Sequence, residues 1–457
     1  MIGAAKQALR QHNRIVPLMR RLLVLVRNEG MAGITLRVRN RLVMNVPNSG
    51  QNATPAADGA AKKHGRNLSL ASHAPQAPLM DLSPGALLVG HPYAVLGRGE
   101  DIRTAANAFE IAQLPFSIRN AWGDVGRETA AMHKEFRLMD RIGTDRPHKA
   151  NVFFLNADEM DNAVALLGAT FFQGRYNIGY WAWELSRFPD AWLGALSNLD
   201  EIWAPSRFIQ QAVAEKTDCP VVWMPLAVEL ADSIRVSREY FGLPDASFLF
   251  LFFFDFRSFV GRKNPMAVLR AFARAFSERH HSRDVRLVIK IHGTHSRPDD
   301  YQTFRALEEF HDSRIILIDK VLDDQEIKEL VRLCDCFVSL HRSEGFGRGL
   351  AEAMFLGKPV IATGYSGNLD FTNEMNACLV DHLLVPVGEN EYPHAAGQLW
   401  ADPDVEQAAW FMRRLVSETG YAAEKGRCAE LYIKTYHSYA AVGARYRRRL
   451  DQLKTLS

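Results

Sequence analysis

The sequence predicts an α/β fold of more than one domain, in which parallel strands alternate with helices. The chain has 457 residues, and chains of this length divide into two or three domains. Apolar runs such as Phe248–Phe254 are long enough for buried strands and far shorter than the roughly 18 residues of a membrane span. The stretch Cys334–Asp370 reads as strand, glycine-bearing loop, helix, strand and loop, which is a parallel crossover unit. Such units bind ligands at the carboxyl ends of their strands.

The composition indicates a globular protein whose charge is unevenly distributed. The chain is 47% hydrophobic and carries a net charge of +3. Residues 1–70 contain twelve Lys or Arg residues and two acidic residues, so the rest of the chain is mildly acidic. The five cysteines are scattered, and Cys334 and Cys336 lack the spacing of a metal site. We therefore expect reduced thiols in a cytoplasmic protein, free or peripheral on the inner face of the cytoplasmic membrane.

A basic N-terminal extension is expected over residues 1–80. Residues 1–44 read as one or two basic amphipathic segments, and residues 45–80 have the Pro, Asn, Gly, Ala and Ser content of a flexible linker. One interpretation of the basic segments is attachment to an anionic membrane surface. The alternatives are a helix packed on the globular part and a disordered tail. Nucleic acid is not an expected partner, because no aromatic residues interleave the basic ones.

The first globular domain is expected over residues 81–230. Its first strand, Ala86–Gly90, leads into a loop whose glycines, Gly97 and Gly99, would let the backbone approach a diphosphate or an acceptor, although a plain turn explains them equally well. The carboxyl ends of later strands carry polar and aromatic side chains, which would face the same ligand cleft as this loop. We predict that four of these residues bind the acceptor, with an aromatic core as the alternative for the two tryptophans: Asn156, Trp181, Trp183 and Ser206.

The second globular domain is expected over residues 231–415, followed by a helical segment over residues 416–457 that crosses back to the first domain. The first strand of the second domain leads into a basic loop with Arg257, Arg262 and Lys263. Cationic side chains at this position would neutralise a diphosphate and help it to leave. A solvated basic loop is the alternative.

Two carboxylates in the crossover unit, Glu344 and Glu352, are separated by seven residues. Between them, Gly345, Gly347 and Gly349 would let the backbone approach a ligand closely, and free amides at the start of the helix suit a phosphate. A carboxylate accepts hydrogen bonds from the hydroxyl groups of a sugar or ribose. A nucleotide sugar is a ligand that combines these features.

These residues resemble the donor motif of the retaining glycosyltransferases of the GT-B fold, glycosyltransferase family 4. That motif is Glu, seven residues and Glu, usually beginning EGFG or EGxG, and this chain has EGFG at residues 344–347 and the second carboxylate at Glu352. The resemblance continues in GKPVIA at residues 357–362 and SGN at residues 366–368. It implies two Rossmann-like domains that face a cleft.

The resemblance also implies roles for individual residues. Many members of the family place a histidine where this chain has Trp183 and Glu184, which makes Glu184 a candidate for the reaction centre. The expected catalytic residues are Glu344, Arg257, Lys263 and Glu184, with Arg262 as an alternative to Arg257. The expected donor-binding residues are Glu352, Gly345, Phe346, Gly347, Arg348, Gly349, Leu350, His292, Gly293, Ser366, Gly367, Asn368, Gly97 and Gly99.

The implied reaction is the transfer of a hexose from a nucleotide diphosphate sugar to a glycan, lipid-linked or polysaccharide acceptor with retention of anomeric configuration, as in polysaccharide or lipopolysaccharide biosynthesis. The nucleotide sugar is the donor substrate, and no cofactor is expected. No metal is expected either, because Arg257 and Lys263 are available for the diphosphate and no DxD-like cluster stands in a donor context. The rivals are a sugar phosphorylase or epimerase on the same fold and a non-catalytic carbohydrate-binding or scaffold protein.

Overall fold

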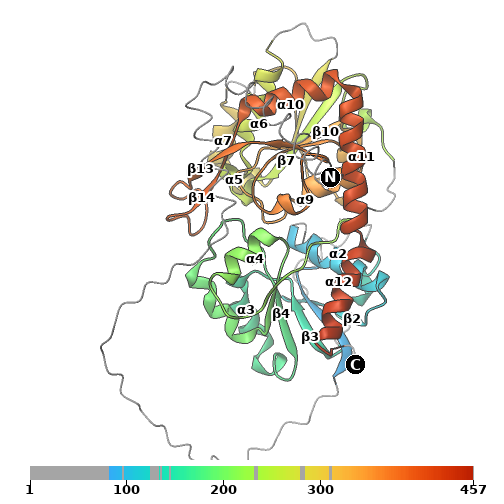
Figure 1. Ribbon diagram of the computed structural model, residues 1–457, viewed down its shortest axis with the longest axis vertical. Coiled ribbons are helices and arrows are strands. Elements are labelled where there is room, and N and C mark those ends of the chain that lie inside the picture. The colour runs from blue at the N-terminus through green and yellow to red at the C-terminus, as the bar shows by residue number, and fades with distance from the viewer. Residues whose placement is uncertain are drawn as a thin grey trace, which may run out of the picture. The chain divides into compact units, whose positions relative to one another are not determined.

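The computed structural model describes residues 82–94, 97–123, 133, 136–143, 146–230, 235–277, 284–307 and 311–455 (Figure 1). All of them belong to one unit of the chain, residues 78–457. The predictions made for the N-terminal extension therefore lie outside the described residues. Within the described residues, no helix is long and apolar enough to cross a membrane.

The first domain is built on a six-stranded parallel sheet with the strand order β2-β1-β3-β4-β5-β6. Its central residues, such as Leu88, Val152 and Ile178, are fully buried, as expected for strands covered on both faces. The strands are β1 (Ser83–Gly90), β2 (Phe116–Asn120), β3 (His148–Phe153), β4 (Tyr176–Tyr180), β5 (Glu201–Ala204) and β6 (Val221–Trp223). The α-helices are α2 (Gly97–Ile111), α3 (Ala157–Leu167) and α4 (Arg207–Ala214).

The second domain contains another six-stranded parallel sheet, with the order β12-β11-β10-β7-β8-β9. The chain reverses its direction of travel across this sheet between β7 and β10. In doubly wound sheets, a ligand crevice lies outside the carboxyl ends of the strands at this switch point. The strands are β7 (Phe248–Asp255), β8 (Val285–His292), β9 (Ile315–Asp319), β10 (Cys336–Ser339), β11 (Val360–Thr363) and β12 (Cys378–Val380).

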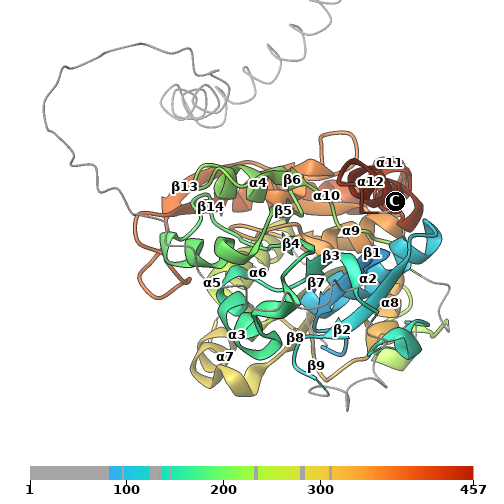
Figure 2. The same ribbon diagram turned by 90° about the horizontal axis from the view of Figure 1, so that it is seen from below.

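Helices and one hairpin complete the second domain. The helices are α5 (Val260–Lys263), α6 (Pro265–Ala275), α7 (Pro298–Arg305), α8 (Asp324–Leu333), α9 (Arg348–Phe355) and α10 (Val405–Ser417). Outside the parallel sheet, β13 (His382–Pro386) and β14 (Leu399–Pro403) form an antiparallel hairpin. Figure 2 shows this hairpin and the C-terminal helices on opposite sides of the molecule.

The C-terminal helices connect the two domains. Helix α11 (Thr419–Tyr436) runs along the second domain, and α12 (Tyr439–Gln452) packs beside α2 of the first domain (Figure 1). Tyr446 of α12 is fully buried and stacks on Trp203, with their ring centroids 5.3 Å apart. Arg449 pairs with Glu201, whose side chain is buried in the first domain.

The predicted fold class, two parallel α/β domains, is confirmed. Strand β4 ends at Tyr180, so Trp181 and Trp183 follow it in the loop beyond its carboxyl end. Its neighbour β5 ends at Ala204, and the amide of Trp181 donates a last hydrogen bond to the carbonyl oxygen of Trp203.

Candidate functional site

A buried ion cluster lies at the switch point of the second sheet. Helix α5 follows β7 and carries Arg262 and Lys263, while Glu344 lies in the loop after β10. The Nζ atom of Lys263 is 2.5 Å from Oε1 of Glu344, and Nη1 of Arg262 is 3.3 Å from Oε2. Arg262 also donates a 3.0 Å hydrogen bond to the carbonyl oxygen of Ser343. Two cations and one carboxylate therefore meet where this fold binds ligands.

The electrostatics of the cluster keep Glu344 ionised. Burial alone would raise the pKa of its carboxyl group, but Lys263 and Arg262 outweigh burial and hold that pKa at about 2. For Lys263 burial is the larger influence, and it lowers the pKa of the ammonium group even though Glu344 opposes it. At neutral pH Glu344 is therefore a hydrogen-bond acceptor and not a proton donor.

Tight backbone packing fixes the position of Glu344. Its amide donates a 2.8 Å hydrogen bond to Oγ of Ser366, and its carbonyl oxygen accepts one from the amide of Gly367. A Cβ atom on Gly367 would lie 2.0 Å from the carbonyl oxygen of Gly345, so no side chain fits there. Ser366 itself has a φ of 70°, a conformation that costs free energy in a residue with a side chain. The SGN and EGFG segments thus support each other's backbone.

Asn368, the third residue of the SGN segment, orients a buried histidine that the sequence analysis had not singled out. Oδ1 of Asn368 lies 3.0 Å from Nε2 of His341, and Nδ1 of His341 lies 3.0 Å from Oγ of Ser339. Burial lowers the pKa of His341 to about 4, although Glu344 opposes this shift. His341 is therefore neutral at physiological pH. The sequence signal for His341 was its position two residues after the buried strand β10.

The structure does not bring Arg257 to Glu344 but pairs it with its neighbour Asp255. Nη2 of Arg257 lies 2.6 Å from Oδ2 of Asp255, and its side chain is 39% exposed. Arg262, the predicted alternative, is the arginine beside Glu344. The physical reason is that Arg262 lies inside α5, whereas Arg257 lies at the start of the loop and can reach the carboxylate at the end of β7. A role for Arg257 in donor binding stays a prediction.

His292 and Gly293 lie beside that pair at the end of β8. His292 is the register partner of Asp255, and burial lowers the pKa of its imidazole. Gly293 has a φ of 73°, and a Cβ atom there would lie 2.6 Å from Oδ1 of Asp255. The loop after β8 thus packs tightly against the start of the basic loop.

The second carboxylate of the motif, Glu352, lies in α9 and is 8% exposed. Burial raises the pKa of its carboxyl group to about 7, although the charge of Arg348 opposes this shift. Arg348 donates a 2.6 Å hydrogen bond to Asp101 of α2, which joins the two domains here. Its Nε atom is buried and has no hydrogen-bond partner. The Nε–H group of Arg348 is therefore a hydrogen-bond donor that no described side chain uses.

The other predicted residues of α9 and its N-terminal loop are packing residues in this structure. Phe346 lies 5.0 Å from the ring of Phe371, and Leu350 is 2% exposed. Gly347 caps α9 with a φ of 96°. A Cβ atom on Gly349 would lie 2.8 Å from the ring of Phe253, so glycine is needed for packing there. Contacts of these residues with a donor would come from their backbone.

The two glycines after β1, Gly97 and Gly99, differ in the space that a side chain would have. A Cβ atom on Gly99 would lie 2.1 Å from the carbonyl oxygen of Ala94, so Gly99 allows the loop to close on itself. A Cβ atom on Gly97 would meet no atom within 4 Å. The turn interpretation explains Gly99, and Gly97 is left beside open space at the start of α2.

The four residues predicted to bind the acceptor are buried or engaged in structural contacts. Trp181 and Trp183 are 0% and 2% exposed, so neither ring offers a free face to a sugar, and the aromatic-core alternative describes them. Asn156 caps α3 and accepts a hydrogen bond from the amide of Ala182. Ser206 caps α4 and donates a 2.6 Å hydrogen bond to the carbonyl oxygen of Gly345. These contacts explain the residues without an acceptor.

Glu184 does face the ion cluster across the domain boundary. Its backbone carbonyl oxygen accepts a hydrogen bond from Oγ of Ser343, and its negative charge helps to raise the pKa of Arg262 against the effect of burial. Its Oε2 atom accepts a 2.5 Å hydrogen bond from the hydroxyl group of Tyr392. Sequence reasoning missed Tyr392, because no motif marks the segment between β13 and β14.

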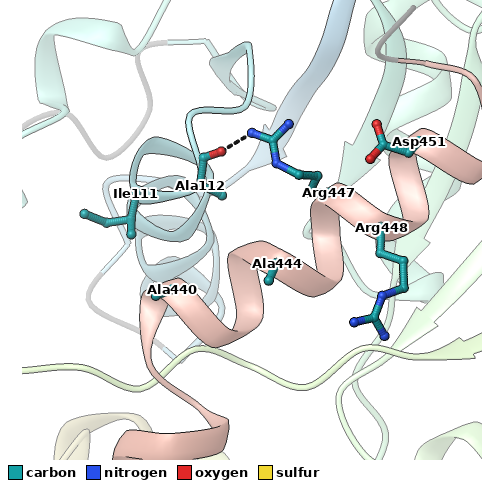
Figure 3. Close-up of a pocket in the computed structure, with 7 residues that line it drawn as sticks. All are labelled: Ile111, Ala112, Ala440, Ala444, Arg447, Arg448 and Asp451. Carbon is teal, nitrogen blue, oxygen red and sulfur yellow. Dashed lines mark hydrogen bonds between the residues drawn. The ribbon is translucent and has the colours of Figure 1, made fainter.

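A separate depression lies between α2 and α12, lined by Ile111, Ala440, Ala444 and Arg447 among others (Figure 3). Arg447 donates a hydrogen bond there to the carbonyl oxygen of Ala112. None of the residues of the ion cluster lines it. Among the described residues, no group of three or more His, Cys, Asp or Glu side chains has the arrangement of a metal site.

Part of the second domain matches a known family, and both domains resemble solved structures. Residues 257–402 match the family model of glycosyl transferases group 1. No curated protein sequence matches the chain. Similar solved structures include a glycosyltransferase from Rickettsia africae, with 14% identity, a TM-score of 0.59 and coverage of 82% of this chain and 100% of that one. HepE from Anabaena in complex with UDP-glucose has 13% identity, a TM-score of 0.58 and coverage of 80% and 100%. At these identities the likeness shows a shared fold, the GT-B fold.

Proposed function

We propose that this chain is a retaining, family 4 type glycosyltransferase that transfers a hexose from a nucleotide diphosphate sugar to a glycan, lipid-linked or polysaccharide acceptor. The observation that carries the proposal is the ion cluster of Lys263, Arg262 and Glu344 at the switch point of a GT-B fold. The cluster lies within residues 257–402, the segment that matches glycosyl transferases group 1. The UDP-glucose in the structure of Anabaena HepE supports a nucleotide sugar as the class of donor.

The two cations supply the chemistry that the leaving group needs. Negative charge grows on the nucleotide diphosphate as its bond to the anomeric carbon breaks. Arg262 is buried, Lys263 is half-buried, and both are already oriented by Glu344, so they would stabilise that charge with little reorganisation. Two cationic side chains at the diphosphate are the basis for proposing a reaction without a metal.

The two carboxylates would then bind hydroxyl groups. Glu344 is ionised and adjoins the cations, so it would accept hydrogen bonds from the sugar beside the diphosphate. Glu352 is the proposed acceptor for the ribose hydroxyl groups. Because its pKa is about 7, hydroxyl donors would favour its ionised form, and binding of the nucleotide would release a proton near neutral pH.

The acceptor would enter from the side of Glu184. We propose a lipid-linked or polymeric acceptor together with a cytoplasmic enzyme that residues 1–44 hold at an anionic membrane surface. Nine Lys or Arg residues against one acidic residue in that segment support this part of the proposal.

A donor panel tests the proposal. UDP-glucose, UDP-N-acetylglucosamine, GDP-mannose and dTDP-rhamnose are each screened for thermal stabilisation and for release of the nucleoside diphosphate. A ligand that binds the native state raises the melting temperature by mass action, and we expect this for one nucleotide class. An NMR spectrum of the sugar product early in the reaction reports whether the anomeric configuration is retained. Binding without release of the diphosphate would favour the carbohydrate-binding or scaffold alternative.

A further inference from the structure

The loop between β13 and β14, residues 387–398, reaches from the second domain to the first, and we call it the strap. Its base is part of the second domain, because the amide of Ala401 in β14 donates to the carbonyl oxygen of Arg342 in the loop after β10. Figures 1 and 2 both show the β13–β14 hairpin on the side away from α11 and α12, where the chain crosses between the domains. The strap therefore bridges the domains where no covalent connection does so among the described residues.

The strap is bound to the first domain by specific contacts. The side chain of Gln398 accepts a 3.2 Å hydrogen bond from the amide of Arg187 and donates a 2.7 Å bond to its carbonyl oxygen. His394 packs edge-on against Trp192, with ring centroids 5.1 Å apart. Gln398 is 5% exposed, so this pair of bonds is shielded from water. These contacts make the strap part of the interface between the two domains.

Tyr392 lies at the centre of the strap and touches both sides of the reaction site. Its hydroxyl group donates to Glu184 of the first domain at 2.5 Å. Its ring lies 4.9 Å from that of Phe259, which precedes the helix with the two cations. The guanidinium of Arg262 lies 5.9 Å from the ring centroid. Burial raises the pKa of the phenol well above its ordinary value, so Tyr392 stays a neutral donor.

We propose that the strap is the acceptor-side wall of the reaction centre and that Tyr392 is a positioning residue that holds Glu184 for the incoming acceptor hydroxyl. This inference rests on the proposed function and extends it to residues outside the donor motif. A carboxylate has about four acceptor positions, and Tyr392 occupies one of those on Oε2. The remaining positions can accept a hydrogen bond from an acceptor sugar or from water. Without Tyr392 the carboxylate would be free to turn toward Arg262.

Water serves as the acceptor in the test, so no natural acceptor is required. In donor hydrolysis the bond between the anomeric carbon and the diphosphate oxygen breaks, a water oxygen bonds to that carbon, and a free sugar, a nucleoside diphosphate and a proton result. The donor is the member of the panel above that the full chain hydrolyses fastest. Tyr392→Phe removes the hydroxyl group and keeps the ring packing.

A matched control is available in the same domain. The hydroxyl group of Tyr240 donates to Oε1 of Glu326 at 2.7 Å, and Tyr240 is 56% exposed. Tyr240→Phe therefore removes the same kind of bond away from the site. We expect Tyr392→Phe to lower kcat about tenfold with an unchanged KM for the donor, and Tyr240→Phe to leave both unchanged.

A double-mutant cycle with Glu184→Gln decides whether Tyr392 acts through Glu184. We expect the effect of Tyr392→Phe on kcat to disappear in the Glu184→Gln background, because the two residues then act as one unit. Additive effects, or an unchanged kcat in Tyr392→Phe, would overturn the inference and leave the proposed function standing. If the full chain hydrolyses no donor of the panel, the proposed function itself fails, and the inference falls with it.

Discussion

Replacing Glu352 with Gln should change how the stability of the protein depends on pH. The pKa of this carboxyl group is raised from 4.5 to about 7, chiefly by burial. The native state therefore holds a proton between these pH values that the unfolded state has released. Stability falls as the pH rises from 4.5 to 7, and above pH 7 the full cost of a buried charge is present.

The size of the effect follows from the two pKa values. One pKa unit corresponds to about 1.4 kcal/mol, so the ionised Glu352 destabilises the native state by about 3 kcal/mol above pH 7. Glu352→Gln keeps the shape and carries no charge. We expect the variant to be about 3 kcal/mol more stable than the natural protein at pH 8 and within about 1 kcal/mol of it at pH 5.

Urea unfolding at pH 5 and pH 8 measures this difference. Glu344→Gln is an informative contrast, because Lys263 and Arg262 lower the pKa of Glu344 to about 2 against the effect of burial. The stability that this residue contributes is present above pH 4.5, so its variant should be destabilised equally at both pH values. If Glu352→Gln has the same free energy difference at pH 5 and pH 8, the assignment of a buried, protonated Glu352 is refuted.

Three further predictions test other parts of the structure. Lys263→Ala should lower kcat about 10²- to 10³-fold with a smaller change in donor affinity, whereas the control Lys216→Ala, which breaks an exposed ion pair, should leave kcat unchanged. Steady-state kinetics measures both variants, and a change confined to KM in Lys263→Ala would contradict its role in stabilising the leaving group. Gly367→Ala should cost more than about 2 kcal/mol of stability in urea unfolding, because its Cβ would meet a backbone oxygen at 2.0 Å, while Gly97→Ala should be tolerated; equal costs would refute the packing argument. A chain without residues 1–79 should lose sedimentation with anionic vesicles at low salt and keep donor hydrolysis, whereas unchanged sedimentation with a lower melting temperature would favour a packed extension.

The features that the sequence predicted correctly depend on local patterns. Apolar runs and glycine-bearing loops predicted two parallel α/β domains, which the two six-stranded parallel sheets confirm. Those patterns operate within one strand, loop and helix, where sequence distance limits the possible geometry. They could not decide between Arg257 and Arg262, because that choice depends on where α5 begins and on the competing carboxylate Asp255.

The features that the sequence left undetermined depend on contacts between distant segments. Trp183 stands beside a charged residue, as a sugar platform would, yet the rings of Trp192 and Tyr392 pack around it and bury it. Tyr392 is 208 residues away from Glu184, its hydrogen-bond partner. No local pattern in a single sequence encodes such a pair.

The crossing of α12 to the first domain means that this domain is assembled from two separate parts of the chain. A fragment cut after β6 would lack Tyr446, and the stacked face of Trp203 would be exposed to water together with that of Phe109. It would also leave the carboxylate of Glu201 buried without the guanidinium of Arg449. During synthesis the first domain cannot complete its core until α12 has left the ribosome, and α12 follows the second domain in the chain. The first domain therefore reaches its native packing only after the second domain has been synthesised.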